Sequence, residues 1–173
     1  MNGIFILAEL DGEQAARIRA VQHRFDPRLA RELPPHVTLI GSSGAGPIAP
    51  DSTVDELRAA VEAVTKTAAP LSLWFQPALR FIGREIVVLP LDPHGPLRAL
   101  HDRLKESGIH CATARWPFTP HCTLNYYATL TPKSLRPLLA VREVEPWRLH
   151  TIRAYHSRDN LPPKHLFDAP LLG

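Results

Sequence analysis

Runs and periodicities of hydrophobic residues divide the chain into predicted strands and helices. Residues 4–10 form an apolar run that ends at Asp11-Gly12, which is typical of a buried strand. Apolar side chains that recur every three or four positions predict amphipathic helices at 13–25, 54–64, 96–107 and 132–140. Short runs of strand-forming residues predict further strands at 35–41, 71–75, 79–82, 85–91, 119–127 and 147–155, with an edge strand near 166–167.

The predicted elements follow the same order twice: strand, helix, strand, helix, strand. The first helix of each half begins near Asp11 and Pro96, which lie 85 residues apart. This repeat predicts an α/β (α+β) fold with bilobal pseudo-symmetry, in which each lobe has a mostly antiparallel sheet and outer helices. We expect one domain, 1–173, made of lobes at about 1–82 and 83–173 that can exchange terminal strands, with the active-site cleft between them.

Composition narrows the class of protein only slightly. The chain has 173 residues, 45% of them hydrophobic and 21% charged, as in a globular protein. Its net charge of +3 is compatible with a phosphate-bearing partner but too small to imply one. The first apolar run is too short to cross a membrane and does not resemble a signal peptide, so we expect a cytoplasmic protein that binds no membrane. Cys111 and Cys122 are expected to be reduced.

A five-residue pattern occurs twice, as Pro35-His36-Val37-Thr38-Leu39 and as Pro120-His121-Cys122-Thr123-Leu124. One His-x-Thr triplet would carry little information, but two copies that share the flanking Pro and Leu are not expected from composition alone. In a strand, residues i and i+2 point to the same face. Each copy is therefore predicted to present an imidazole and a hydroxyl together, as half of one site.

Two opposed histidines can transfer protons in both directions near neutral pH, and threonine hydroxyls can donate to an anion between them. These groups suit phosphoryl transfer without a metal. A zinc site is less favoured, because the sequence has no Cys-x-x-Cys or His-Glu-x-x-His motif. A nucleophilic threonine and a purely structural role of the histidines are also less favoured interpretations of the pattern. His101 and His110 are expected to be solvated or capping residues.

The two motifs in this order resemble the 2H phosphoesterase superfamily, and within it the 2'-5' RNA ligase and RNA 2',3'-cyclic phosphodiesterase group. The resemblance implies that His36, Thr38, His121 and Thr123 are catalytic and that no metal or other cofactor is needed. It implies hydrolysis of 2',3'-cyclic phosphate ends of RNA or nucleotides, and it leaves open whether the reverse reaction, 2'-5' RNA ligation, is also used. We expect the protein to be a monomer. By analogy, His36 would protonate the leaving oxygen and His121 would activate water. The residues themselves do not assign these two roles.

The resemblance is imperfect after the second motif. Many relatives carry a basic residue there, whereas this chain has Asn125, Tyr126 and Tyr127. We therefore expect substrate contacts from Arg115, Trp116, Phe118 and Tyr126, because a guanidinium pairs with phosphate and an aromatic ring stacks on a base. Core packing is the alternative role for Trp116 and Phe118.

The sequence leaves two further points open. The glycine-rich segment 41–47 is predicted to be either a plain connection or a substrate-binding loop. The alternative function is a non-catalytic module that binds RNA or nucleotides in the same cleft and turns nothing over.

Overall fold

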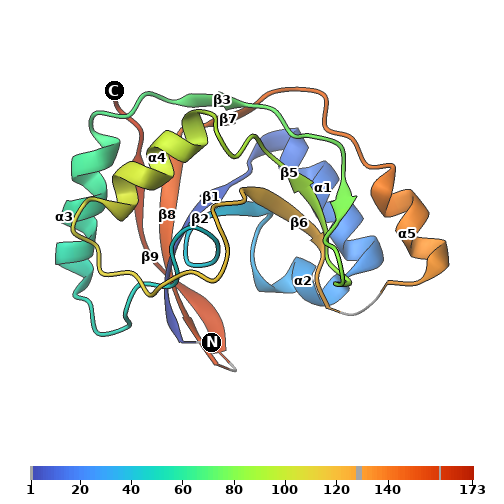
Figure 1. The fold of residues 1–173 in the computed structure, drawn as a ribbon, viewed down its shortest axis with the longest axis horizontal. Coiled ribbons are helices and arrows are strands. Elements are labelled where there is room, and N and C mark those ends of the chain that lie inside the picture. Colours follow the sequence, from blue (N-terminus) through green and yellow to red (C-terminus); the bar gives the residue numbers. More distant parts are fainter. Residues whose placement is uncertain (1, 128–129, 160) are drawn as a thin grey trace.

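The computed structural model describes residues 2–127, 130–159 and 161–173, and helices and strands are interspersed along the chain (Figure 1). In chain order they are β1 (Gly3–Glu9), α1 (Gly12–Phe25), α2 (Pro27–Glu32), β2 (His36–Ile40), α3 (Val54–Thr65), β3 (Leu71–Leu73), β4 (Leu79–Arg80), β5 (Val87–Pro90), α4 (Pro96–Lys105), β6 (His121–Asn125), α5 (Pro132–Leu139), β7 (Trp147–Leu149), β8 (Thr151–Arg158) and β9 (Leu161–Pro170).

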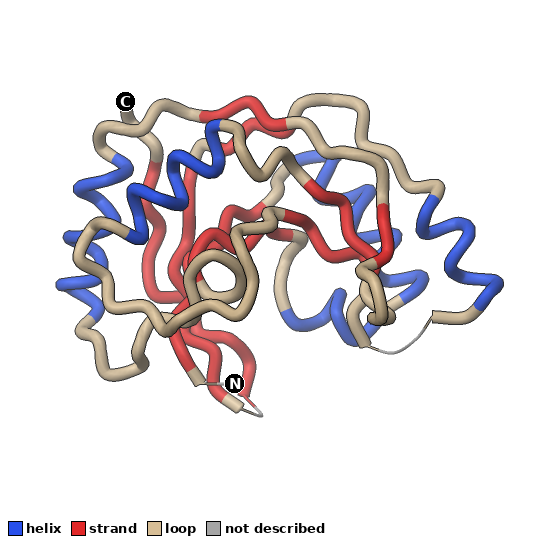
Figure 2. The backbone as a smooth tube through the Cα atoms, viewed as in Figure 1, coloured by secondary structure: helices blue, strands red, loops and turns tan. Residues whose placement is uncertain are grey.

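The centre of the fold is a seven-stranded antiparallel sheet in the order β4-β5-β6-β2-β1-β8-β9. A second sheet contains only β3 and β7, which pair above it in the view of Figure 2. The mixed α/β class with antiparallel strands and helices is confirmed. Strands of both chain halves are joined in one sheet, because β2 pairs with β6 at Val37 and Cys122. The division into lobes at about residue 82 stays a prediction.

The strands next to the junction of β2 and β6 are arranged alike on its two sides. On one side β2 pairs with β1, and on the other β6 pairs with β5. Each of these pairs has a register irregularity at the same level, next to the residue that faces the motif threonine. The two motif strands are therefore neighbours in the middle of the sheet, and each has the same kind of outer partner.

Helices cover the side of the motif strands that carries their hydrophobic residues. Helix α1 packs against β6 and α4 packs against β2, so each helix contacts the motif strand of the other half of the chain. Val37, Leu39, Cys122 and Leu124 have no exposed surface and belong to the same core as Ile18 of α1. The alternation of the strands then places the motif histidines and threonines on the opposite face.

Three features of the secondary structure differ from the expectations. No helix is predicted between residues 25 and 35, but Asp26 caps α2 there and Pro27 begins it, a combination that favours a helix start. The strand expected at 147–155 is divided into β7 and β8, because β7 pairs with β3 while β8 pairs with β1. The tail strand is longer than expected and spans β9, where Pro162 and Pro163 are tolerated because β9 is an edge strand.

The glycine-rich segment after β2 is a packed connection. The backbone N–H of Gly44 donates to the carbonyl of Trp116, and that of Gly46 donates to the carbonyl of Ala112. Gly44 has a φ of +74°, and a Cβ atom there would lie 2.5 Å from Nε2 of His101. The expectation that His101 is solvated or capping is wrong: its ring is 1% exposed and stacks on Phe118.

Within the described residues, no helix combines the length and the apolar composition that crossing a bilayer requires.

Candidate active site

The four motif residues lie next to one another on one face of the central sheet. Because Val37 pairs with Cys122 in an antiparallel arrangement, His36 lies opposite Thr123, and Thr38 lies opposite His121. Directly opposed side chains in such a pair have Cβ atoms about 4.5–5.5 Å apart. His36, Thr38, His121 and Thr123 therefore form a compact tetrad with the two histidines on one diagonal.

Both imidazoles are oriented by the same hydrogen bond to the backbone two residues earlier. Nδ1 of His36 lies 2.8 Å from the carbonyl oxygen of Pro34, and Nδ1 of His121 lies 2.7 Å from that of Thr119. A carbonyl oxygen only accepts, so Nδ1 carries the hydrogen in each ring. In the neutral imidazole, Nε2 then holds the lone pair and is the atom that exchanges protons.

The surroundings of the tetrad favour neutral imidazoles. Burial lowers the pKa of His36, and the Pro34 carbonyl and the Glu9 carboxylate oppose this change only in part. Burial also lowers the pKa of His121, opposed by the Thr119 carbonyl and reinforced by the charge of His36. The last effect couples the two rings, so charging one makes charging the other harder.

The residues beside the two histidines break the symmetry of the tetrad. Glu9 lies opposite His36 in the pairing of β1 with β2, whereas Pro90 lies opposite His121 in the pairing of β5 with β6. The carboxylate of Glu9 is 10% exposed and accepts hydrogen bonds from Arg153 and from the Tyr155 hydroxyl. A negative charge therefore lies near His36 but has no counterpart at the position opposite His121.

The tetrad opens into a cleft of about 780 Å³, whose lining includes His36, Thr38 and Thr123. The cleft is bounded by α2, by the segment after β6, and by the ends of β8 and β9. His121 is not part of this lining; its ring meets Phe81 edge-on, with the ring centroids 5.1 Å apart. Three of the four predicted catalytic residues thus contact the cleft directly.

Of the predicted substrate-binding residues, only Tyr126 lines the cleft. Phe118 is buried against His101, which is the core role that the sequence left open. Trp116 is 58% exposed, and Arg115 lies over its ring at 4.8 Å from the centroid, away from the cleft lining. The structure does not bring Arg115, Trp116 or Phe118 into this cavity.

The cleft also contains residues that the sequence alone does not single out. They are Gln22 of α1, Arg28 of α2, Tyr127 after β6 and Tyr155 of β8. None of them belongs to a motif. The alternation of β8 places Tyr155 on the same face as Arg153, but that face is recognisable only once β8 is known to pair with β1.

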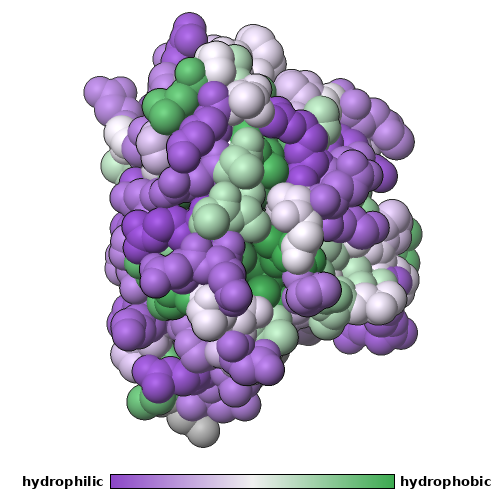
Figure 3. All heavy atoms as spheres, turned by 90° about the vertical axis from the view of Figure 1, so that its left-hand side faces the viewer, coloured by the Kyte–Doolittle hydropathy of each residue, from purple (hydrophilic) through white to green (hydrophobic). Residues whose placement is uncertain are grey.

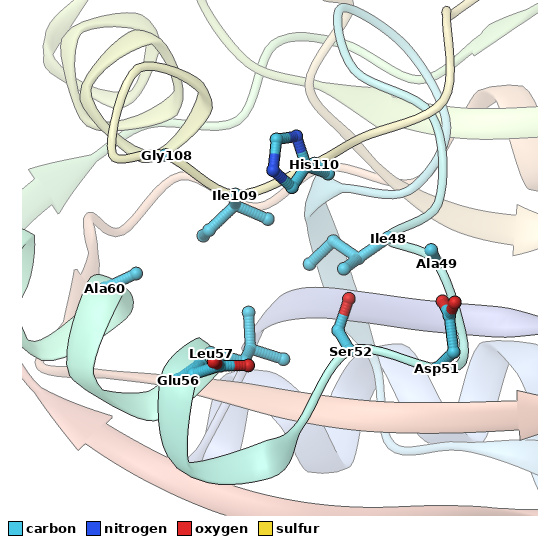
Figure 4. Close-up of a pocket in the computed structure, with 10 residues that line it drawn as sticks. All are labelled: Ile48, Ala49, Asp51, Ser52, Glu56, Leu57, Ala60, Gly108, Ile109 and His110. Atoms are coloured by element: carbon cyan, nitrogen blue, oxygen red, sulfur yellow. The ribbon is translucent and has the colours of Figure 1, made fainter.

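A second cavity of about 490 Å³ lies away from the tetrad, on the side of the molecule that carries α3 (Figure 4). Its lining combines the polar residues Asp51, Ser52, Glu56 and His110 with the apolar residues Ile48, Leu57 and Ile109, and Leu57 and Ile109 extend from opposite sides (Figure 4). Figure 3 shows this side of the molecule, where hydrophobic residues form a band within a hydrophilic surface. No motif residue lines this cavity.

No group of three or more His, Cys, Asp or Glu side chains in 2–127, 130–159 and 161–173 is placed to hold a metal ion.

Solved structures of similar fold cover nearly the whole chain. The protein TT0787 of Thermus thermophilus aligns with 100% of this chain and 99% of its own, with a TM-score of 0.73 and 19% sequence identity. E. coli LigT in complex with NADP+ aligns with 99% of both chains, with a TM-score of 0.65 and 18% identity. At these identities the similarity shows the fold.

Comparison with curated proteins finds no matching sequence. The sequence model of the 2'-5' RNA ligase superfamily matches residues 10–160, a range that includes both His-x-Thr motifs. The chain therefore belongs to the 2'-5' RNA ligase superfamily.

Proposed function

We propose that the protein is a metal-independent phosphodiesterase that hydrolyses 2',3'-cyclic phosphate ends of RNA or nucleotides. The observation that carries this proposal is the tetrad, in which each imidazole lies opposite a threonine hydroxyl on one face of the sheet. A cyclic phosphodiester presents an electrophilic phosphorus that carries two non-bridging oxygens sharing a negative charge and an ester oxygen to be released. The tetrad offers two proton-transfer groups and two hydroxyl donors for such a group.

In the proposed reaction, Thr38 and Thr123 donate hydrogen bonds to the non-bridging phosphate oxygens. Nε2 of His121 accepts a proton from the attacking water as the new P–O bond forms. Nε2 of protonated His36 gives its proton to the ribose oxygen as the ring P–O bond breaks. The product is a ribose phosphomonoester with a free hydroxyl, and proton exchange with water restores both histidines.

The assignment of acid and base rests on the neighbours of the two rings. The negative charge of Glu9 favours a protonated His36, while His121 faces Pro90 and is discouraged from charging by His36. A bound anionic phosphate raises the pKa of both imidazoles, and His36 has the additional carboxylate. We therefore assign the general acid to His36 and the general base to His121.

The choice of a nucleotide or RNA substrate is supported by the family and by its solved relatives. E. coli LigT has been crystallised in complexes with 3'-AMP, NADP+ and ATP. The cleft of this chain is lined by aromatic side chains and arginines, among them Tyr126, Tyr155 and Arg28, which suit a nucleoside phosphate. A ribose hydroxyl that attacks in place of water would give 2'-5' ligation by the same proton transfers.

The test follows hydrolysis of adenosine 2',3'-cyclic phosphate by ³¹P NMR in the presence of EDTA. Wild-type protein is expected to convert it to a monophosphate, and His36→Ala and His121→Ala should each lower kcat at least a hundredfold. His110→Ala is the matched control, because this exposed histidine lies in the second cavity, and it should keep the wild-type rate.

Two outcomes contradict the proposal. Full activity in either motif variant would remove the histidines from the chemistry, and loss of wild-type activity in EDTA would require a metal. Salt-dependent binding of RNA with no turnover of any cyclic phosphate would instead identify the non-catalytic binding module.

A further inference from the structure

A buried carboxylate connects the first half of the chain to the end of the second motif strand. Asp26 lies between α1 and α2 and has no exposed surface. One carboxylate oxygen accepts the N–H of Leu29 at 3.1 Å, which caps α2. The other accepts the N–H groups of Tyr126 and Tyr127 at 2.7 and 2.8 Å. Both tyrosines follow β6 directly and lie about a hundred residues further along the chain.

The side chains of this tyrosine pair form one wall of the cleft. The Tyr127 hydroxyl donates to the Glu32 carboxylate, and Arg28 lies over its ring at 3.9 Å from the centroid. Tyr126 meets the ring of Tyr127 edge-on at 5.0 Å and is 50% exposed. Helix α2 therefore fixes Tyr127, and Tyr127 supports Tyr126 at the surface of the cleft.

The last turn of α1 adds a second contact to the same strand. Nε2 of Gln22 donates to the backbone carbonyl of Thr123 at 2.8 Å, and Gln22 is 3% exposed. Gln22 and Asp26 are four positions apart, so they lie on the same face at the end of α1. Together they hold the backbone of β6 at Thr123 and of the segment that follows it.

We propose that Asp26 is a positioning residue: it holds the Tyr126–Tyr127 segment as the cleft wall against which the nucleoside part of the substrate lies. This inference rests on the proposed function. A carboxylate that accepts three backbone N–H groups fixes the backbone more firmly than a neutral acceptor. Because the wall lies beside Thr123 but contributes no group to the proton transfers, its effect should fall on recognition of the nucleoside.

The experiment compares two cyclic phosphodiesters that differ in the nucleoside. Adenosine 2',3'-cyclic phosphate carries ribose and base, whereas glycerol 1,2-cyclic phosphate has the same five-membered phosphate ring without them. Asp26→Asn keeps the size of the side chain but replaces one carboxylate oxygen by an N–H donor. We expect it to lower the ratio of kcat/KM for adenosine over glycerol substrate at least tenfold, mainly through KM for the adenosine substrate.

Two further variants complete the comparison. Thr53→Ala is the control, because it removes a helix N-cap, that of α3, at a residue that does not line the cleft. It should leave the ratio at the wild-type value. Tyr126→Ala should lower the ratio in the same direction as Asp26→Asn. If Asp26→Asn does not fold, Tyr126→Ala tests the role of the cleft wall instead. Tyr126 is 50% exposed, so its truncation should be tolerated by the fold.

The outcomes separate the two proposals. The positioning role is overturned if the wild type is active but the variants lower kcat/KM for the adenosine and glycerol substrates equally, or change neither value. Wild-type protein that hydrolyses neither substrate overturns the proposed function and this inference with it.

Discussion

Each motif histidine makes the same kind of hydrogen bond to the backbone carbonyl two residues earlier, but the two differ in the charge beside them. Burial lowers the pKa of both, which makes the neutral imidazole the resting form. Glu9 is the carboxylate that distinguishes them, because it raises the pKa of His36, whereas Pro90 occupies the equivalent position opposite His121. The Glu9 carboxylate therefore favours the protonated form of His36 and has no counterpart opposite His121.

Glu9→Gln should lower the pKa of His36 further. The variant removes the negative charge and leaves Arg153 paired with Asp168 alone, so the positive charge of His36 loses its nearest compensation. Titration of the His36 Cε1 proton by NMR measures the change, and the midpoint should move to lower pH. Glu143→Gln is the matched control, because Glu143 is also a buried carboxylate paired with an arginine, and it should leave the midpoint in place. An unchanged His36 midpoint in Glu9→Gln would contradict this role of Glu9.

At the scale of elements, the motif strands are held by helices from the opposite half of the chain. Gln22 of α1 donates to the carbonyl of Thr123 in β6, and Nδ1 of His101 in α4 donates to the carbonyl of Leu39 in β2. Both donors are buried and lie four residues after a buried apolar residue of the same helix, Ile18 or Leu97. A glutamine and a histidine thus each bind a backbone carbonyl of the motif strand from the other half of the chain.

His101→Gln should therefore preserve the fold and reduce its sensitivity to acid. Burial lowers the pKa of His101, so its contribution to stability is present above pH ~6.5 and is lost as pH falls through the lowered pKa. The free energy of unfolding should then fall less steeply in the variant, by up to about 1.4 kcal/mol per pH unit for one proton. Urea unfolding between about pH 7 and pH 4 measures the slope, and an equal slope in both proteins would contradict the assignment.

His101→Ala should lower the free energy of unfolding by about 2–4 kcal/mol, because it leaves a cavity and an unpaired Leu39 carbonyl.

The sequence predicts most helices and strands of this fold and the tetrad residues of the candidate site, for identifiable reasons. The motif strands and the amphipathic helices have local signals, and the repeat places His36 and His121 in matching strands. The cleft wall has no such signal, because Tyr126 depends on Asp26 and the two become neighbours only when α1 packs on β6. The burial of His101 is equally hidden, since its stacking on an aromatic ring is a tertiary contact. The start of α2, in contrast, has a local signal in the Asp-Pro pair at its N-terminus.

At the scale of the whole molecule, the junction of β2 and β6 joins strands from both halves of the chain in one sheet. The pairing of Val37 with Cys122 connects the two parts of the sheet, and both side chains belong to the core shared by the helices. Because the tetrad is formed across this junction, the site exists only while the two parts remain together.

Cys122 provides a probe of that junction. The thiol has no exposed surface, and burial raises its pKa to about 12, so it should not react in the folded protein. In a Cys111→Ser background, the urea concentration at which Cys122 becomes reactive should coincide with the loss of helical circular dichroism. Reaction at a lower concentration of urea would show that the two parts separate before the helices unfold, contrary to a single cooperative unit.

The central claim is that His36 and His121 act as an acid–base pair on one cyclic phosphate, and the pH dependence of kcat/KM tests it most directly. Because the pKa of each free imidazole lies below about 6.5, the wild-type profile should be bell-shaped with its maximum on the acidic side of that value. In the residual activity of His121→Ala the acidic limb should disappear, and in that of His36→Ala the alkaline limb should disappear. A profile that keeps both limbs in both variants would contradict the claim.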